Sequence, residues 1–228
     1  MLTRTSLQNT SRKDSSRRSP HAIPGSPPLA GTFEMMGAPM SFGRNSEIYG
    51  EGEPADYVYK VVSGTVRTSK ILADGRRQIG SFYLPGDVFG LEIGDDHGFS
   101  AEAITESRVL VVRRSALIGL ANRDGDVARQ MWTLAGRELA RVQDHILLLV
   151  KTAQERVVGF LLEMADRTPE ANAVELPMSR QDIADYLGLT IETVSRTLTM
   201  LESDGAIELP TSRCVMLRKR SALARLNA

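Results

Sequence analysis

The sequence has few cysteines and no long apolar runs. A single cysteine among 228 residues excludes an internal disulfide and is typical of proteins that work in a reducing cytoplasm. No apolar run approaches the roughly 18 residues that a membrane span needs, and the start of the chain lacks the apolar segment of a cleavable signal. We therefore expect a globular protein of the cytoplasm that has no membrane partner.

Net charge and catalytic motifs are also missing. The 28 basic and 28 acidic side chains cancel, so the bulk charge neither indicates nor excludes a nucleic-acid partner. The chain has no phosphate-binding loop, no H-x-H cupin pattern and no nucleophile motif, which predicts that it is not an enzyme. Asp95-Asp96-His97 cannot all point at one ion in an extended chain, so we predict a solvated loop without metal. His145, on the polar side of a predicted helix, is a haem-ligand candidate that we do not favour.

Residues 1–30 are rich in Ser, Thr, Arg and Pro. Such a segment buries too little apolar surface to offset its ordering entropy, so we predict a disordered, basic, proline-rich tail. The alternative is a segment that contacts phosphates or a protein partner.

Residues 31–124 alternate short strand-forming stretches with glycine turns, and the strand signal begins at Phe33. Asp74-Gly75 lies between two such stretches and is a strong hairpin signal. Arg108–Arg113 is the last predicted strand. Many short strands with regular turns indicate a closed antiparallel β-roll.

Residues 125–151 form a predicted helix whose apolar positions alternate in spacings of three and four. These positions define a heptad seam, called the seam below: Ala128, Trp132, Ala135, Leu139, Val142, Ile146 and Leu149. So narrow a stripe favours pairing with a second copy around a two-fold axis. Met131, Leu134 and Leu148 lie off the seam and are expected to pack on the roll. The alternative is a helix buried only against its own domain.

The clearest local signals predict two short helices within residues 152–228, after an amphipathic helix at the start of that segment. Ser179, followed three residues later by Asp182, predicts the capped start of the first short helix. Gly188 provides the left-handed turn that ends it, and Thr190 caps the second. Two helices joined so tightly indicate a helix-turn-helix.

The second of these helices has two distinct faces. Its predicted buried stripe is Val194, Leu198 and Leu201, and its opposite, polar face is Glu192, Ser195, Arg196 and Thr199. Residues 206–209 and 213–217 are predicted as the strands of a wing hairpin that turns at Pro210-Thr211-Ser212. An ordinary helical hairpin with a solvated polar face is the alternative reading.

The polar face predicts how DNA would be read. Glu192 can accept a hydrogen bond from a cytosine amino group, and Arg196 can donate two to a guanine. Ile191 is a candidate for a thymine methyl contact, and Ser195 for a base or phosphate contact. The full set of predicted DNA-binding residues is Arg180, Ile191, Glu192, Thr193, Ser195 and Arg196.

The C-terminal segment is not basic as a whole. Residues 152–228 hold 9 basic and 11 acidic side chains. DNA affinity must therefore come from placed charges such as Arg180, Arg196, Arg213 and Arg218. Cys214 is expected to face away from the core of the wing, close in sequence to these cations, which makes it a possible redox-sensitive thiol. An incidental thiol without a regulatory role is the alternative.

Gly188-Leu189-Thr190 and the run Glu192–Arg196 resemble the recognition helix of the Crp–Fnr transcription regulators, and the E-x-x-S-R pattern is most similar to the Fnr and FixK branches. The order of roll, helix and helix-turn-helix resembles that family from about residue 31 onward. The resemblance implies an α+β fold with an N-terminal roll like that of cyclic-nucleotide-binding domains, a dimerisation helix and a C-terminal winged helix-turn-helix.

The resemblance also implies a function. A FixK-like regulator binds double-stranded DNA as a homodimer at TTGA and TCAA half-sites, contacts RNA polymerase and activates genes of low-oxygen metabolism. Phe99 stands where cAMP-responsive relatives have a phosphate-binding arginine, and the chain lacks the cysteine cluster of an Fnr-type iron–sulfur centre, so we predict no cofactor. The alternatives are a roll that binds a small-molecule or haem effector, and a ligand-binding module without a DNA role.

Overall fold

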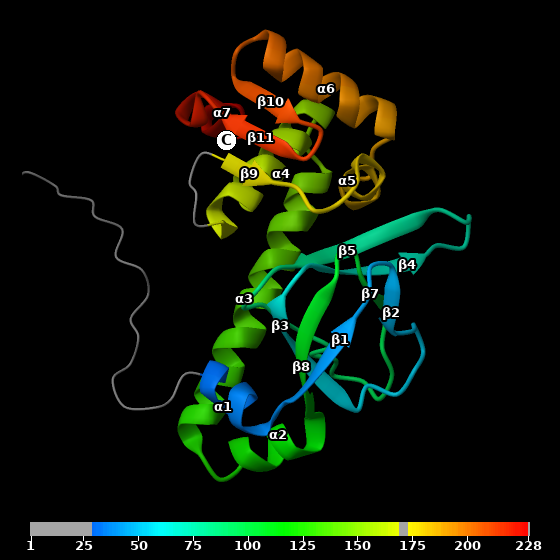
Figure 1. Cartoon of the computed structure of the whole chain (residues 1–228), viewed down its shortest axis with the longest axis vertical. Helices are drawn as coiled ribbons and strands as arrows, with labels where there is room; N and C mark the ends of the chain where they lie inside the picture. The colour runs from blue at the N-terminus through cyan, green and yellow to red at the C-terminus, as the bar shows by residue number, and fades with distance from the viewer. Residues whose placement is uncertain (1–28, 169–172, 228) are drawn as a thin grey trace, which may run out of the picture.

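Three parts follow one another along the long axis of the molecule in the computed structural model (Figure 1). The structure describes residues 29–168 and 173–227. A β-roll occupies one end, a helix-turn-helix domain occupies the other, and the long helix α3 runs from beside the roll to the C-terminal domain. This confirms the predicted α+β architecture, while the limits of the individual domains stay predictions.

Two four-stranded antiparallel sheets form the roll, with strand orders β1-β8-β3-β6 and β2-β7-β4-β5. Their strands are β1 Ala38–Phe42, β2 Ser46–Tyr49, β3 Tyr57–Ser63, β4 Val66–Ile71, β5 Arg77–Tyr83, β6 Val88–Phe89, β7 Ser100–Ala103 and β8 Ser107–Arg113. The β4–β5 hairpin turns at Gly75, whose φ of 82° is the left-handed conformation that the Asp74-Gly75 pair predicted. Because β5 is the last strand of its sheet, its outer edge is free to meet the C-terminal domain.

Two short helices flank the roll, α1 Leu29–Met36 and α2 Arg114–Ala121. The prediction of a strand from Phe33 was wrong: Phe33 lies in α1 and is fully buried beside Val58, Val112 and Leu117. Periodicity cannot distinguish a strand from a buried helix in so short an apolar run. The predicted tail lies outside the described residues except for positions 29 and 30, which belong to α1.

Aromatic side chains fill the interior of the roll. Tyr59 stacks on Phe89 with ring centroids 5.0 Å apart, and Tyr83 lies 5.2 Å from the same phenyl ring. His97 stacks on Tyr49 at 3.5 Å and is buried, so the prediction that it belongs to a solvated loop was wrong. The adjacent Asp95 and Asp96 are exposed as expected.

Helix α3, Gly125–Leu149, is capped by Asp124, whose side chain accepts hydrogen bonds from two backbone amides of the first turn. Met131 and Leu134 pack against the cluster formed by the roll with α1 and α2, as predicted. Leu148 does not follow that prediction, because its side chain packs against Gly159 of α4 in the C-terminal core.

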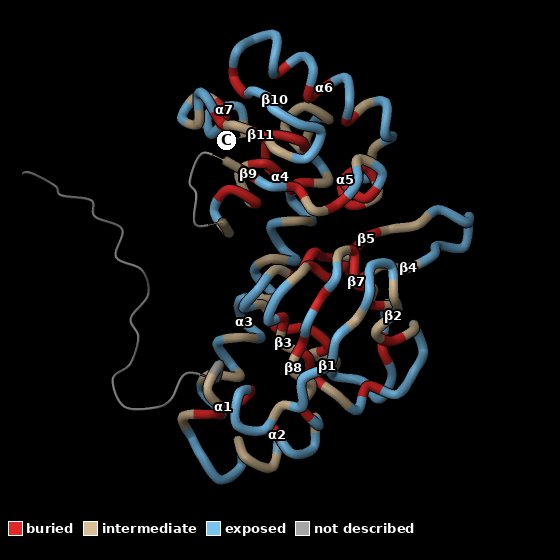
Figure 2. The backbone as a smooth tube through the Cα atoms, viewed as in Figure 1, coloured by how far each residue is buried: buried red, intermediate tan, exposed pale blue. Residues whose placement is uncertain are grey.

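The C-terminal domain combines four helices with a three-stranded sheet of order β10-β11-β9. Its elements are α4 Ala153–Arg167, β9 Ala173–Glu175, α5 Arg180–Leu187, α6 Ile191–Ser203, β10 Ile207–Thr211, β11 Cys214–Leu217 and α7 Arg220–Leu226. The helix-turn-helix and the wing hairpin confirm the predictions, whereas β9 and α7 were not predicted. The wing turns at positions 212–213, later than predicted, because β10 continues through Pro210. Figure 2 shows buried positions on α5, α6, β9 and β11, and together with those of α4 they belong to one hydrophobic cluster.

Candidate nucleic-acid interface

Helix α6 is the second helix of the helix-turn-helix, and local contacts fix its start. Gly188 has a φ of 61°, and its amide bonds to the carbonyl of Ala184, so the chain turns sharply after α5. The Thr190 hydroxyl accepts a hydrogen bond of 3.3 Å from the amide of Thr193. The sequence therefore encodes the angle between α5 and α6 through one glycine and one cap.

The two faces of α6 lie as the sequence predicts. Val194, Leu198 and Leu201 are buried in the C-terminal core. The opposite face is exposed and consists of Glu192, Ser195, Arg196 and Thr199. Within the described part of the chain, neither Glu192 nor Arg196 forms an ion pair, so both side chains are available to an external partner.

The remaining predicted DNA-contact residues differ from one another. Ile191 is at the surface at the start of α6, with 36% of its area exposed. Thr193 is half-buried, and its hydroxyl lies 3.1 Å from that of Thr190, which gives it a role in the helix cap. Arg180 is half-buried at the start of α5, where burial lowers its pKa from the ordinary value. One of its guanidinium nitrogens is buried and has no hydrogen-bond partner among residues 29–168 and 173–227, so Arg180 does not share the open setting of Arg196.

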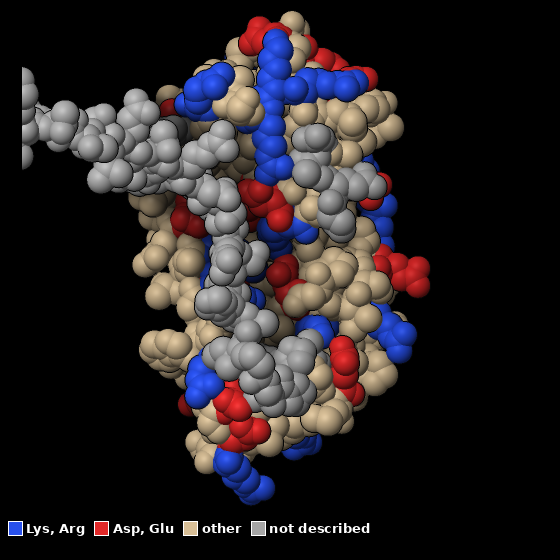
Figure 3. All heavy atoms as spheres, turned by 90° about the vertical axis from the view of Figure 1, so that its left-hand side faces the viewer, with Lys and Arg blue, Asp and Glu red and all other residues tan. Residues whose placement is uncertain are grey.

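The wing adds further charge beside α6. Arg213 is exposed, whereas Arg218 is paired with Glu208 through its Nε at 2.8 Å. Cys214 is half-buried and alternates with buried Val215 as predicted, while its redox sensitivity stays a prediction. On the face in Figure 3, basic and acidic side chains are interspersed at the end formed by the C-terminal domain.

A hollow of about 710 Å³ separates the start of α6 from the β4–β5 hairpin of the roll. Arg76 and Gln78 line it from the hairpin, and Gln181 and Glu192 line it from the helix-turn-helix. The roll thus approaches the DNA-reading element directly. No signal in the sequence predicted this juxtaposition, because a hairpin and a helix more than 100 residues apart share no local pattern.

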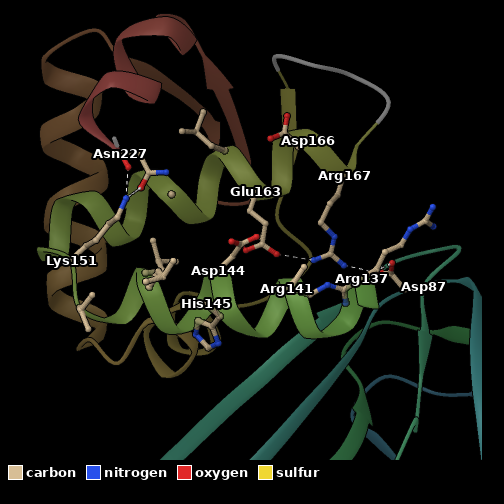
Figure 4. A pocket seen from close by; sticks show the side chains of 16 residues that line it. Asp87, Arg137, Arg141, Asp144, His145, Lys151, Glu163, Asp166, Arg167 and Asn227 are labelled. Carbon is tan, nitrogen blue, oxygen red and sulfur yellow. Dashed lines mark hydrogen bonds and ion pairs between the residues drawn. The ribbon is translucent and has the colours of Figure 1, made fainter. Parts of the chain in front are cut away.

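A second hollow, of about 770 Å³, lies between α3, α4 and α7 (Figure 4). Its cations are largely matched: Arg167 pairs with Asp87 at 2.5 Å and with Glu163 at 3.2 Å, and Arg141 lies 3.4 Å from Asp87. These ion pairs connect the roll, the long helix α3 and helix α4 of the C-terminal domain.

The haem-ligand candidate His145 is engaged in a structural contact. Its Nε2 lies 2.8 Å from the carbonyl oxygen of Tyr186, and its ring stacks on the Tyr186 ring at 4.0 Å. Burial lowers the pKa of His145 from its ordinary value, which favours the neutral ring. Over the described ranges, no group of three or more His, Cys, Asp or Glu side chains could hold a metal ion.

The seam residues of α3 lie along one stripe of the helix surface. Trp132 is 81% exposed, and Leu139, Val142 and Ile146 are also exposed. Leu149, at the end of α3, is half-buried, and the small Ala128 and Ala135 are exposed. Among the described helices, none is long and apolar enough to cross a membrane.

Comparison with known proteins places this architecture in a family. Residues 39–124 match the family model of the cyclic nucleotide-binding domain, and residues 155–226 match that of the Crp-like helix-turn-helix domain. The nitrogen fixation regulation protein FixK of Azorhizobium caulinodans is 56% identical over 199 residues, which cover 85% of this chain and 80% of that protein. FixK of Rhizobium meliloti is 44% identical over 79% of this chain and 82% of its own length.

A solved structure agrees with these relatives. FixK2 from Bradyrhizobium japonicum is 52% identical, superposes with a TM-score of 0.81, and covers 85% of this chain and 98% of its own. The agreement extends over the roll, the long helix and the helix-turn-helix. The relatives are transcription regulators, and neither of the matching family models describes a catalytic domain. The chain is therefore a member of the Crp–Fnr family, a DNA-binding transcription regulator of the FixK type.

Proposed function

We propose that this regulator binds a palindrome of TTGA and TCAA half-sites as a homodimer and, with RNA polymerase, activates genes of low-oxygen metabolism in a bacterial cytoplasm. The relatives named nitrogen fixation regulation proteins support the physiological part of this proposal. The palindrome follows from the resemblance of the recognition helix and from two-fold symmetry, because each subunit of a symmetric dimer reads one half-site.

The observation that carries the proposal is two exposed charges on α6, neither of which forms an ion pair with the residues that the structure describes. Glu192 and Arg196 are four residues apart and therefore lie on the same side of the helix. A TTGA half-site contains one G·C pair, which offers a cytosine amino donor to a carboxylate and guanine O6 and N7 to a guanidinium. Both side chains can thus read the same base pair from opposite strands.

The exposed seam supports the dimer. Trp132, Leu139 and Ile146 are large apolar side chains on one stripe of α3, each more than half exposed in the single chain. A contiguous apolar stripe of this kind marks an interface, and a heptad repeat is the pattern of a helix that pairs with its own copy. Pairing of two α3 helices would bring the two α6 helices to the same side of the assembly.

A binding titration with two duplexes tests the proposal. One duplex carries the palindrome, and the other has the G·C pair of each half-site replaced by A·T. We expect the replacement to weaken binding by roughly 1–3 kcal/mol per half-site, because it exchanges the guanine O6 acceptor for an amino donor and the cytosine amino donor for a carbonyl acceptor. Equal affinity for the two duplexes at the same salt concentration would refute the proposed reading.

No effector is proposed for the roll. The aromatic cluster of Tyr49, Tyr59, Tyr83 and Phe89 fills its interior, and Phe99 cannot bind a phosphate as a guanidinium does. Calorimetry with cyclic nucleotides and an absorption spectrum for haem test the alternative of a ligand-binding roll.

A further inference from the structure

Helix α5, the first helix of the helix-turn-helix, is held at its start by two arginines of the roll. One carboxylate oxygen of Asp182 accepts from Arg67 Nη1 at 2.6 Å and from Arg77 Nη2 at 2.7 Å. The other oxygen of Asp182 accepts from the amide of Ser179 at 3.0 Å, which completes the helix cap. The same side chain therefore caps α5 and attaches it to the roll.

Two more carboxylates complete this ionic contact. Arg77 Nε donates to Asp185 at 2.7 Å, one turn further along α5, and Arg67 Nη2 donates to Glu102 of β7 at 2.7 Å. The side chain of Asp182 is 6% exposed and that of Arg67 is 11% exposed. Charges so deeply buried require their partners, because an unpaired charge in such a site is strongly unfavourable. The contact is therefore specific in its geometry.

The C-terminal end of α5 is also held by side chains from other elements of the chain. The carbonyl oxygen of Tyr186 accepts from Gln78 of β5 at 3.4 Å and lies 2.8 Å from His145 of α3. Arg156 of α4 donates to the carbonyl oxygen of Leu187 at 2.9 Å. Phe82 of β5 packs on the Tyr186 ring at 5.3 Å. Both ends of an eight-residue helix are thus fixed, and the roll takes part at each end.

We propose that Arg67, Arg77, Asp182 and Asp185, called the latch below, position the recognition helix relative to the dimer seam without an effector. In the latched arrangement Glu192 and Arg196 stay exposed, so latching does not conceal the reading face. The short turn at Gly188 and the buried stripe of α6 transmit the position of α5 to α6. The latch residues are positioning residues, since they act on DNA only through the placement of α6.

The spacing of half-sites is the property that the latch should control. The two recognition helices of a dimer must enter successive major grooves, whose centres are about 34 Å or roughly 10 base pairs apart. If the latch holds each helix-turn-helix at one angle, the dimer should prefer that spacing strongly. If the latch opens, the domains should reach other spacings with less penalty. This inference rests on the proposed function, because it requires a palindromic site and a dimer.

The test compares the parent with Arg77→Asp, Asp185→Arg and the double variant on duplexes whose half-site centres are about 10 or about 12 base pairs apart. We expect each single variant to lose about tenfold in its preference for the shorter spacing, within the range usual for coupling between sites. The double variant restores the opposite-charge pair between positions 77 and 185 but leaves the introduced carboxylate at position 77 facing Asp182, so it should recover part of the preference. Arg108→Asp, at an exposed position of β8 in the other sheet of the roll, is the matched control.

The outcomes separate the latch from a merely structural role. Sedimentation and thermal unfolding accompany every variant, and recovery in the double variant cannot come from a damaged helix-turn-helix. Single variants that keep the parental spacing preference would overturn the latch, as would a double variant that stays as impaired as the single ones. A parent that binds both spacings equally would overturn the proposed function, and the latch with it.

Discussion

The two helices of the helix-turn-helix use their carboxylates in opposite ways. Asp182 and Asp185 of α5 are mostly buried and bound by arginines of the roll, whereas Glu192 of α6 is exposed and forms no ion pair within the described residues. The two helices are separated by a turn of three residues. The comparison shows that the carboxylates of α5 form ion pairs within the chain, while the charged side chains of α6 are available to DNA.

Separating the two subunits should have the largest effect on DNA binding, because the proposed palindrome is read by two α6 helices, one from each subunit. Leu139→Lys would place two like charges into the apolar seam, and each buried charge costs several kcal/mol. We expect a monomer by sedimentation and loss of tight binding to the palindrome. Thr133→Lys, exposed on α3 but off the seam, is the control. A Leu139→Lys protein that stays dimeric would show that the seam is wrongly placed.

The next effect compares the two carboxylates directly. Asp182→Ala should lower the free energy of unfolding by about 3–5 kcal/mol, because it removes one of the two carboxylates that pair with the buried Arg67, together with the Asp182 side of the helix cap. Glu192→Ala should change it by no more than about 0.5 kcal/mol, as is usual for an exposed site. Urea unfolding monitored by circular dichroism measures both. Similar losses for the two variants would remove the distinction between the helices.

Arg196→Ala should have the reverse pattern, with a loss in binding and not in folding. We expect the affinity for the palindrome to fall by roughly 1–3 kcal/mol per half-site, together with the preference for the G·C pair. The free energy of unfolding should stay within about 0.5 kcal/mol of the parent. Anisotropy titrations at one salt concentration, with Arg108→Ala as the control, decide the matter. Parental affinity in the Arg196→Ala protein would exclude the assigned contact.

A smaller effect is expected from pH. Burial lowers the pKa of His145 below its ordinary 6.5, so the unfolded chain takes up this proton before the folded one does. The contribution of the neutral ring is complete above that value and declines as the pH falls below it. Parent protein should therefore lose more stability between about pH 7.5 and about pH 5.5 than His145→Phe does. The same pH dependence in both proteins would assign the effect to other groups.

No effect at all is expected from cAMP. The interior of the roll is filled with aromatic side chains, and the resemblance predicts Phe99 at the position where cAMP-responsive relatives have a phosphate-binding arginine. DNA affinity should therefore be equal with and without the nucleotide. A tenfold rise in affinity, about 1.4 kcal/mol, would show that the roll offers the phosphate another partner.

The local elements of the DNA-reading part were determined by the sequence alone. Ser179, Gly188 and Thr190 each act within four residues of themselves, through a cap or a left-handed turn, so their consequences could be derived without any tertiary information. The spacing of Val194, Leu198 and Leu201 likewise predicts which face of α6 is buried, because helical periodicity is a property of the chain itself. The same holds for the exposed apolar stripe of α3.

Only the tertiary structure decided which charges are attached and which are free. Arg67 and Asp182 are 115 positions apart, and in the sequence Arg67 is an ordinary polar residue of a strand. His97 and His145 looked solvent-exposed from their neighbours, yet each stacks on a tyrosine from a distant element. Phe33 was predicted to lie in a strand, but it lies in helix α1 and is buried against the roll. In each case the partner comes from another part of the chain, and burial depends on the fold as a whole, which no local pattern records.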